Sequence, residues 1–284
     1  MSSWRPRIPS FLHDAKRIPM SALKPKFPGT GILLLAFLIL FLVEVQAHAG
    51  VVMYGTRVIY PSEKSFVSVR LANQDKTPHL IQAWADDGSL PAEKAAPAPF
   101  VVLPPLFRLD GGAQQSVRLM FSGDVDLPAD RESLYWFNFL QVPPESPAGP
   151  DVGGAQISIS FLNQVKLLYR PATVKGEVHD LRDRLVFTLT RSGKDWRLTA
   201  ENPTGFYANF VEAAHLRVGD ESLPVDFGGA VTLAPFSSLS WRLAGGRASM
   251  AAPSLEFSLI DDSGNPRTHR KAVAVLAPDG GTNP

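Results

Sequence analysis

The side chains that most often perform chemistry are few in this chain, and they lack the spacing that catalysis or metal binding needs. Four of the six histidines follow residue 50, and none belongs to an H-x-H or H-E-x-x-H pattern: His79, His179, His215 and His269. The sequence has no cysteine to complete a ligand set. It also has no G-x-S-x-G nucleophile turn and no phosphate-binding glycine loop. We therefore predict a protein without enzymatic activity, metal or cofactor.

Two pairs of neighbouring carboxylates have a simpler interpretation than a metal site. Asp86 and Asp87 stand in "DDG", and Asp261 and Asp262 stand in "IDDSG". Aspartate is common in such turns because its side chain accepts hydrogen bonds from the backbone two residues further on. We expect turns at both places.

A lysine inside an apolar run is the most informative charge in the sequence. The stretch "QISISFLNQVKLLYRP", residues 156–171, has the branched and aromatic composition of a β-strand, and Lys166 lies within its apolar part. Ile157, Ile159 and Phe161 alternate with other residues, so an ideal strand places all three on one face. By itself this pattern predicts an edge strand whose lysine reaches solvent along its aliphatic stem.

The beginning of the chain has the pattern of a secretory leader. Lys24 and Lys26 precede about a dozen apolar residues, Ile32–Val43, and the small-x-small motif Ala47-His48-Ala49 follows. This order is typical of a signal peptide over residues 1–49, with Met20 as an alternative start. The apolar run is shorter than the roughly 20 residues of a spanning helix. An uncleaved anchor is the alternative, but we expect a mature protein that begins near Gly50, outside the cytoplasm, without stable membrane insertion.

Charge and cysteine content exclude further classes. Removal of residues 1–49 leaves 22 of the 28 basic residues and 25 of the 27 acidic residues, a net charge of −3. Such a balance provides no electrostatic surface for nucleic acid. Without disulfides, the fold depends on its hydrophobic cores alone.

The pattern beyond residue 50 predicts an all-β protein of two immunoglobulin-like sandwiches in tandem. Short runs of alternating apolar residues recur between turn signals, and we find no convincing helical period. Pro171 is the expected boundary, because proline ends the hydrogen-bond ladder of a central strand. We therefore expect an N-terminal domain over 50–171, with its last strand at 156–170. The C-terminal domain is expected over 172–284, with a short flexible tail.

Five motifs, in this order, resemble the periplasmic pilus-assembly chaperones. They are "YGTRVIYP" (54–61), "NQDKTPHLIQAWADD" (73–87), "PPLFRLDGGAQQSVRL" (104–119), "LPADRESLYWFNFLQVPP" (127–144) and "VKLLYRP" (165–171). The resemblance implies a boomerang of two sandwiches with an interdomain cleft, and a chaperone that folds and caps fimbrial subunits before an outer-membrane usher receives them. Members of this family lend a strand to an incomplete subunit, which implies that Ile157, Ile159 and Phe161 enter the groove of that subunit.

The resemblance also assigns the charged residues. Arg57 and Lys166 match the cations that bind the C-terminal carboxylate of the subunit, although a surface arginine and a solvent-reaching lysine remain the alternative. Glu132, Arg170 and Asp262 match a structural charge network between the domains, with Asp261 as an alternative partner. Residue numbers 157, 159 and 161 are odd whereas 166 is even, so a bulge or strong twist near Asn163 would be needed to bring both sets to one face.

Three further expectations concern the type of chaperone and its alternatives. A short segment from Pro143 to Ala155 and the absence of cysteine favour the short-loop branch of the family. The apolar row on an edge strand also predicts a self-capping homodimer, because exposed edges promote association. An orphan sandwich with another client and a secreted structural or adhesive tandem module remain alternatives, and a hydrolase lacks its catalytic residues here.

Overall fold

The computed structural model of the protein describes residues 50–90, 94–144, 158–229, 231–243 and 250–276. Strands dominate this part of the chain, and its only helical elements are a 3-10 turn, η2 (Val178–Asp180), and a single helical turn, α2 (Leu181–Arg184). The expected signal peptide at 1–49 and the C-terminal tail lie outside the described residues. None of the described helices is both long and apolar enough to cross a membrane.

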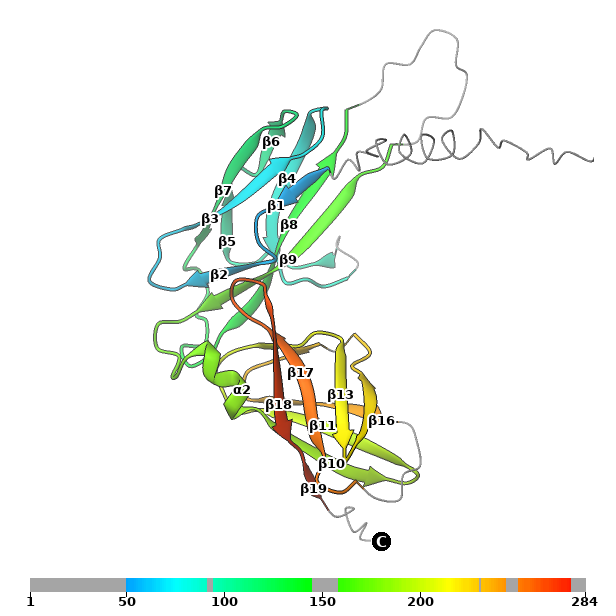
Figure 1. Ribbon diagram of the computed structural model, residues 1–284. Coiled ribbons are helices and arrows are strands. Elements are labelled where there is room, and N and C mark those ends of the chain that lie inside the picture. Colours follow the sequence, from blue (N-terminus) through cyan, green and yellow to red (C-terminus); the bar gives the residue numbers. More distant parts are fainter. Residues whose placement is uncertain (1–49, 91–93, 145–157, 230, 244–249, 277–284) are drawn as a thin grey trace, which may run out of the picture. The chain divides into compact units, whose positions relative to one another are not determined.

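The first sandwich consists of nine strands in two sheets (Figure 1). One sheet has the order β1-β3-β7-β5 and the other has the order β2-β9-β8-β4-β6. The strands are β1 (Val51–Met53), β2 (Arg57–Pro61), β3 (Val67–Asn73), β4 (His79–Asp86), β5 (Phe100–Leu103), β6 (Leu106–Leu109), β7 (Gln114–Phe121), β8 (Ser133–Val142) and β9 (Phe161–Arg170).

The core of this sandwich follows from the alternation in its sequence. In β3, Val69 and Leu71 are buried whereas Ser68 and Arg70 are exposed, as expected for a strand with one face on the core. Phe137 of β8 and Leu167 of β9 come from the opposite sheet and belong to the same cluster of buried residues. The two sheets therefore enclose one apolar layer between them.

The first extended segment changes sheets. The run "VVMYGTRVIYP" suggests one strand, but β1 pairs with β3 in one sheet and β2 pairs with β9 in the other. Gly55 lies at the crossing with φ of 104°, a conformation that residues with a Cβ rarely adopt. The change of sheet leaves β2 beside only the last part of β9.

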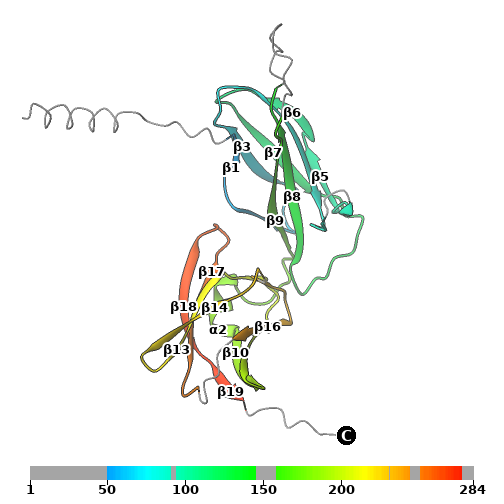
Figure 2. The ribbon, with the colours of Figure 1, turned by 90° about the vertical axis from the view of Figure 1, so that its right-hand side faces the viewer.

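Strand β9 has two neighbours along its second half and one along its first half. It pairs antiparallel with β8 from Phe161 to Tyr169, and the two strands run side by side in Figure 2. It pairs parallel with β2 only from Lys166 to Arg170. Among the described strands, none pairs with the other edge of Phe161–Val165.

The second sandwich is formed by the remaining strands and has its own core. Its sheets have the orders β16-β11-β10-β19 and β14-β13-β17-β18, and a two-stranded ribbon joins β12 to β15. The strands are β10 (Val186–Ser192), β11 (Asp195–Asn202), β12 (Ala208–Asn209), β13 (Ala213–Val218), β14 (Glu221–Asp226), β15 (Thr232–Leu233), β16 (Ser237–Leu243), β17 (Ser254–Ile260), β18 (Pro266–Ala272) and β19 (Ala274–Leu276). Phe187, Phe210 and Trp241 belong to its buried cluster.

The helical turns η2 and α2 precede the second sandwich and were not expected. Leu181 of α2 and Leu185 directly after it are buried in the core of the second sandwich. A segment this short carries too few residues for a helical period to be recognised in the sequence. Its two leucines therefore fix the entry of the chain into this domain.

Candidate functional site

A row of in-register residues crosses one sheet of the first sandwich. Arg57 of β2 pairs with Lys166 of β9, which pairs with Trp136 of β8, which pairs with Asp86 of β4. Directly paired residues on neighbouring strands project from the same face of a sheet. Because β2 and β9 are adjacent, the two predicted binding cations lie side by side. The structure therefore brings Arg57 and Lys166 together.

Lys166 is held by neutral oxygen atoms of the second sandwich. Its Nζ donates a 2.5 Å hydrogen bond to Oδ1 of Asn209 and another hydrogen bond to Oγ1 of Thr232. Burial, followed by the positive charge of Arg57, lowers the pKa of Lys166 to about 8. Amide and hydroxyl oxygens solvate the ammonium without neutralising it. Lys166 therefore remains a cation without a counter-ion among the described residues.

Arg57 is also incompletely partnered. Its Nη1 donates a 3.2 Å hydrogen bond to the carbonyl oxygen of Ile260, whereas its Nε is buried and has no hydrogen-bond partner among the described residues. Burial lowers the pKa of the Arg57 guanidinium, although the charges of Asp262 and Asp261 oppose this shift. No described carboxylate forms an ion pair with Arg57 or Lys166. Two neighbouring cations without a carboxylate form a site for an anion.

The three residues expected to form a charge network lie in direct contact. Nε of Arg170 donates to Oε1 of Glu132 at 2.7 Å, and its two terminal nitrogens donate to Asp262 at 2.7 and 2.8 Å. Glu132 is only 3 % exposed, and its second oxygen accepts a 2.7 Å hydrogen bond from the backbone N–H of Tyr207. Residues of both sandwiches thus contribute to one hydrogen-bonded cluster.

The network has the electrostatics of a buried ion cluster. Burial raises the pKa of Glu132, although Arg170 and the Tyr207 amide favour the charged carboxylate. For Arg170, burial disfavours the charge, but the hydrogen bonds to Asp262 and the charge of Glu132 outweigh it and raise the pKa. Removal of Arg170 would leave the buried carboxylate of Glu132 without its cation.

Asp261 and Asp262 have separate contacts. Asp262 pairs with Arg170, whereas Oδ1 of Asp261 accepts a hydrogen bond from the backbone of Asn265 and its Oδ2 accepts one from Arg267. Asp261 therefore makes the contacts of a turn aspartate, and Asp262 contributes to the network.

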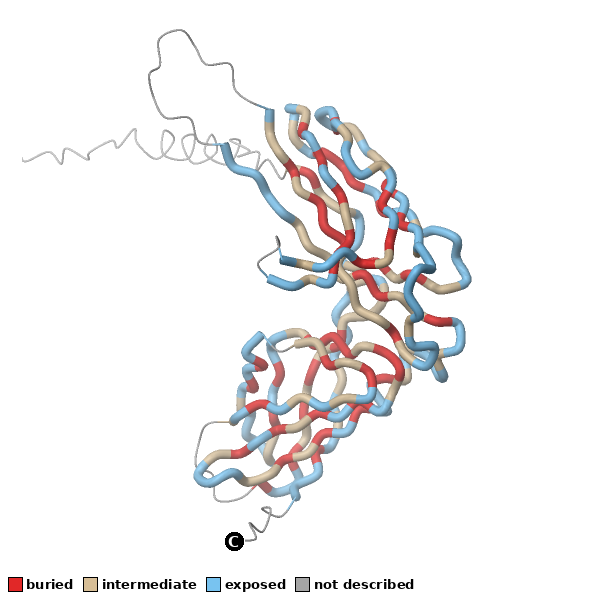
Figure 3. Tube along the Cα trace, turned by 180° about the vertical axis from the view of Figure 1, so that it is seen from behind, coloured by how far each residue is buried: buried red, intermediate tan, exposed pale blue. Residues whose placement is uncertain are grey.

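The beginning of β9 is exposed, in contrast to its end (Figure 3). Ile159 is 60 % exposed and Phe161 is 58 % exposed, whereas Leu167 and Leu168 are buried. Ile157, the third residue of the expected row, lies outside the described residues. The strand itself begins at Phe161 instead of residue 156. Its pairing with β8 also starts there, because Phe161 faces Gln141 close to the end of β8.

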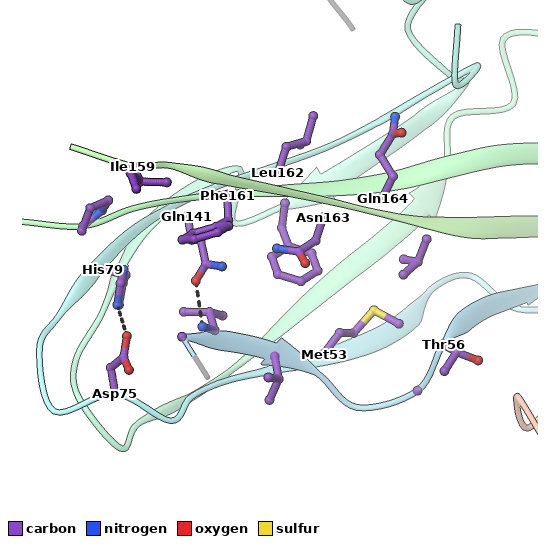
Figure 4. A pocket seen from close by; sticks show the side chains of 17 residues that line it. Met53, Thr56, Asp75, His79, Gln141, Ile159, Phe161, Leu162, Asn163 and Gln164 are labelled. Carbon is purple, nitrogen blue, oxygen red and sulfur yellow. Dashed lines mark hydrogen bonds and ion pairs between the residues drawn. The ribbon is translucent and has the colours of Figure 1, made fainter. Parts of the chain in front are cut away.

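A groove of about 720 Å³ lies beside the exposed part of β9. Val51 and Met53 of β1 line one wall, and Phe139, Ile159 and Phe161 contribute apolar surface to the other. Figure 4 shows Phe161 and Asn163 on the side of β9 that faces β1, with Leu162 and Gln164 on the opposite side. Ile159 and Phe161 therefore border an open groove at the edge of the sandwich.

The bulge considered near Asn163 is absent. Pairing between β8 and β9 continues through nine consecutive residue pairs, from Phe161 opposite Gln141 to Tyr169 opposite Ser133. Val165 packs against the core of the first sandwich, and regular alternation places Phe161 on the same face of β9 (Figure 4) and Lys166 on the other face. Phe161 and Lys166 therefore lie on opposite faces of one regularly paired strand.

Asn209 and Thr232 were not predicted as site residues. Each belongs to a strand of two residues, and no periodic pattern identifies so short an element. The available signal was a single asparagine between apolar residues in "YANF" (207–210). Separately, no group of three His, Cys, Asp or Glu side chains placed to hold a metal occurs in the described part of the chain.

Comparison with known families identifies the family of the chain. The chain matches the N-terminal domain of the pili and flagellar-assembly chaperone PapD over residues 50–175, and the C-terminal domain of the pili assembly chaperone PapD over residues 180–271. These matches cover more than half of the chain, which therefore belongs to the PapD family of pilus-assembly chaperones.

Relatives in this family share about a third of the sequence. The chain is 34 % identical to the probable fimbrial chaperone YadV of Escherichia coli K12, covering 76 % of this chain and 87 % of YadV. It is 36 % identical to the chaperone protein FimB/FhaD of Bordetella pertussis, covering 80 % of this chain and 90 % of that protein.

Solved structures confirm the fold. The crystal structure of the YadV chaperone aligns with a TM-score of 0.65 at 32 % identity, over 78 % of this chain and 98 % of YadV. A complex of the Salmonella enterica pilin SafA with the SafB chaperone aligns with a TM-score of 0.61 at 30 % identity, over 78 % of this chain and 96 % of the matched chain. The prediction of a two-domain, chaperone-type all-β fold is therefore confirmed.

Proposed function

We propose that this protein is a periplasmic chaperone that binds and caps fimbrial subunits by lending them strand β9, and then delivers them to an outer-membrane usher. The support is its family membership together with one structural observation. Two exposed apolar residues, Ile159 and Phe161, lie at the beginning of β9, and a few residues later the strand carries a cation that pairs in register with a second cation. No described carboxylate neutralises these cations.

The cation pair is the proposed anchor for the client. Arg57 and Lys166 bind the C-terminal carboxylate of the subunit, because each has hydrogen-bond donors that the described residues leave unused. Hydrogen bonds between charged groups are roughly twice as strong as neutral ones. A terminal carboxylate differs from a side-chain carboxylate in that it fixes the end of the chain, and with it the position of every preceding residue.

The exposed half of β9 is the proposed binding strand. The edge of Phe161–Val165 that β2 does not cover has free backbone groups for a client strand. Ile157, Ile159 and Phe161 then fill the open core of the subunit. Full burial of each contributes roughly 1.5–3 kcal/mol, before the cost of ordering the partners is subtracted.

Anchor and strand together determine the register of the complex. Shifting a β-strand by one residue moves all its side chains to the opposite face. With the client terminus fixed at Arg57 and Lys166, only one pairing brings the apolar row to the client's core. The network of Glu132, Arg170 and Asp262 supports this arrangement by holding residues of the two sandwiches in contact.

We also propose where the chaperone acts and what it does without a client. A signal peptide at residues 1–49 directs it to the periplasm. The short segment before β9 favours the short-loop branch of the family. In the absence of a client, two copies cover their exposed apolar rows by forming a homodimer, because such an edge favours association.

Capture of subunits from the periplasm tests this function. The tagged chaperone is co-expressed with the fimbrial subunits of its own organism, and bound subunits are identified by mass spectrometry. We expect wild type to capture a subunit, and Arg57→Ala and Lys166→Ala to lose it while they retain the wild-type melting temperature. Lys64→Ala is the matched control, because Lys64 is an exposed lysine of the same sandwich. Normal capture by both cation variants would refute the anchor, and no capture by wild type would favour another client.

A further inference from the structure

The ribbon of β12 and β15 presents its two polar residues to the ammonium group of Lys166. Ala208 pairs with Leu233 and Asn209 pairs with Thr232, so this small sheet consists of two residue pairs. Ala208 and Leu233 are fully buried in the core of the second sandwich. Asn209 and Thr232 contact Lys166. One pair thus attaches the ribbon to the core, and the other reaches a residue of the first sandwich.

The orientation of the Asn209 amide is fixed by its surroundings. Its Nδ2 donates a 3.4 Å hydrogen bond to the carbonyl oxygen of Tyr207, while its Oδ1 accepts from Lys166. An ammonium group can only donate, so the amide oxygen must face Lys166. Asn209 is 4 % exposed, which leaves water little access to its side chain. The acceptor is therefore held in place from both sides.

The same residues connect the anchor to the charge network. The backbone N–H of Tyr207 donates to Glu132, and the carbonyl oxygen of Tyr207 accepts from Asn209. Glu132 in turn accepts from Arg170. A continuous series of hydrogen bonds thus runs from the structural network to Lys166 through one backbone residue.

On this basis, and resting on the proposed function, we propose that Asn209 and Thr232 are positioning residues of the anchor. They hold Nζ of Lys166 next to Arg57 and leave one of its three N–H donors for the carboxylate of the client. Because both acceptors are neutral, they orient the cation without cancelling its charge. An acidic residue at either position would orient Lys166 equally well but would occupy the anchor with an internal ion pair.

One substitution distinguishes a neutral partner of Lys166 from an acidic one. Asn209→Asp is almost identical in size and places a carboxylate against Lys166. We expect the variant to fold, since the new charge is paired, and to lose client capture at least as completely as Lys166→Ala. Thr232→Val removes the hydroxyl at constant shape and is expected to reduce client affinity about tenfold, the effect of losing a hydrogen bond to a charged group. Thr232→Ser retains the hydroxyl and should restore wild-type affinity.

The titration of Lys166 can be measured without any client, so it tests the positioning role independently of the proposed function. The titration of Lys166 is followed by NMR through its Cε–Hε resonances in protein labelled with ¹³C-lysine, with Lys166→Arg used for assignment. We expect the pKa of Lys166 to rise in Asn209→Asp and to fall in Asn209→Ala and Thr232→Val. Thr188→Val is the matched control, because Thr188 lies in β10 of the same sandwich and forms no hydrogen bond to Lys166.

The two experiments have distinct outcomes. An unchanged Lys166 titration in both Asn209→Ala and Thr232→Val would overturn the positioning role. Wild-type capture by Asn209→Asp would overturn its contribution to the anchor. If the titrations shift as expected but wild-type protein captures no fimbrial subunit, the positioning of Lys166 is supported and the proposed client is wrong.

Discussion

Lys166 and Arg170 lie four residues apart on the same face of β9, yet their surroundings are opposite. Arg170 contacts the carboxylates of Glu132 and Asp262 through three of its nitrogens. Lys166 contacts an amide and a hydroxyl oxygen and forms no ion pair with a described residue. Both are partly buried, and both contact residues of the second sandwich. The difference is therefore in the charge of the partners.

This contrast separates a cation that is neutralised within the fold from a cation that has no counter-ion among the described residues. Arg170 is neutralised within the fold, so its cluster has little remaining affinity for an external anion. Burial lowers the pKa of both Lys166 and Arg57, and the positive charge of Arg57 lowers that of Lys166 further. The protein tolerates this unfavourable pair, which is typical of a site that a ligand completes.

The largest expected effect is the loss of the structural cation. Arg170→Met leaves Glu132, which is 3 % exposed, as a buried carboxylate without its cation. Breaking a buried ion pair from one side costs about 3–5 kcal/mol, and we expect this loss in the free energy of unfolding. Urea denaturation followed by tryptophan fluorescence measures it.

Lys166→Met is the matched control for this prediction. It removes a cation on the same strand and face, but this cation is repelled by the positive charge of Arg57. Its loss should therefore change the free energy of unfolding by no more than about 1 kcal/mol. Equal destabilisation by the two variants would remove the distinction between the clusters.

The second prediction concerns pH. The pKa of Lys166 is lowered to about 8, and as pH rises above this value the anchor loses half of its charge. Client affinity should therefore fall by about tenfold per pH unit above 8. The stability of the free chaperone should change in the opposite direction. Between about pH 8 and the ordinary lysine value near 10.4, the unfolded chain binds more protons, so the free energy of unfolding rises with pH.

Isothermal titration calorimetry with a captured subunit and urea denaturation over pH 7–10 measure the two trends. Lys166→Arg remains charged throughout this range, and its client affinity should not change with pH. If the profile of this variant coincides with that of wild type, Lys166 is not the titrating group.

The smallest expected effect on stability is at the exposed end of β9. Ile159 is 60 % exposed, so Ile159→Asp should change the free energy of unfolding by less than about 0.5 kcal/mol. The same substitution should abolish both client capture and the proposed homodimer, because it places a charge in the apolar row. Analytical ultracentrifugation measures the dimer. Val186→Asp, at another exposed apolar residue, is the control and should leave the dimer intact.

Much of this arrangement could be predicted from the sequence because it depends on local patterns. Alternation in "SFVSVRLANQD" (65–75) predicts β3, and the cations in "GTRVIYP" and "VKLLYRP" lie within identifiable strands. The structure places Arg57 and Lys166 in register, and it brings Glu132, Arg170 and Asp262 into contact. Strand pairing explains only the first of these juxtapositions, and both sets of residues were predicted from the resemblance to a known family.

The remaining features depend on tertiary contacts that no local pattern encodes. Asn209 and Thr232 are 23 positions apart in sequence and meet only through the pairing of β12 with β15. The apolar residue numbers and the lysine differ in parity, which suggested a bulge. The regular pairing of β8 and β9 shows instead that Phe161 and Lys166 lie on opposite faces of the strand. Opposite faces would conflict with the proposed function only if a single surface had to bind both the apolar core and the terminal carboxylate of the client.

The parallel pairing of β2 with β9 has a consequence for the order of folding. Residues 57–61 find their partner only at residues 166–170, so the first sandwich depends on a contact separated by more than a hundred residues. Contacts of this range form slowly, because a long loop must close before they are gained. If the chain crosses a membrane from its N-terminus, as we propose, β2 has no partner until most of the first domain has emerged. The strand that completes the first sandwich is then among the last to arrive, and the proposed anchor does not exist until this sandwich has folded.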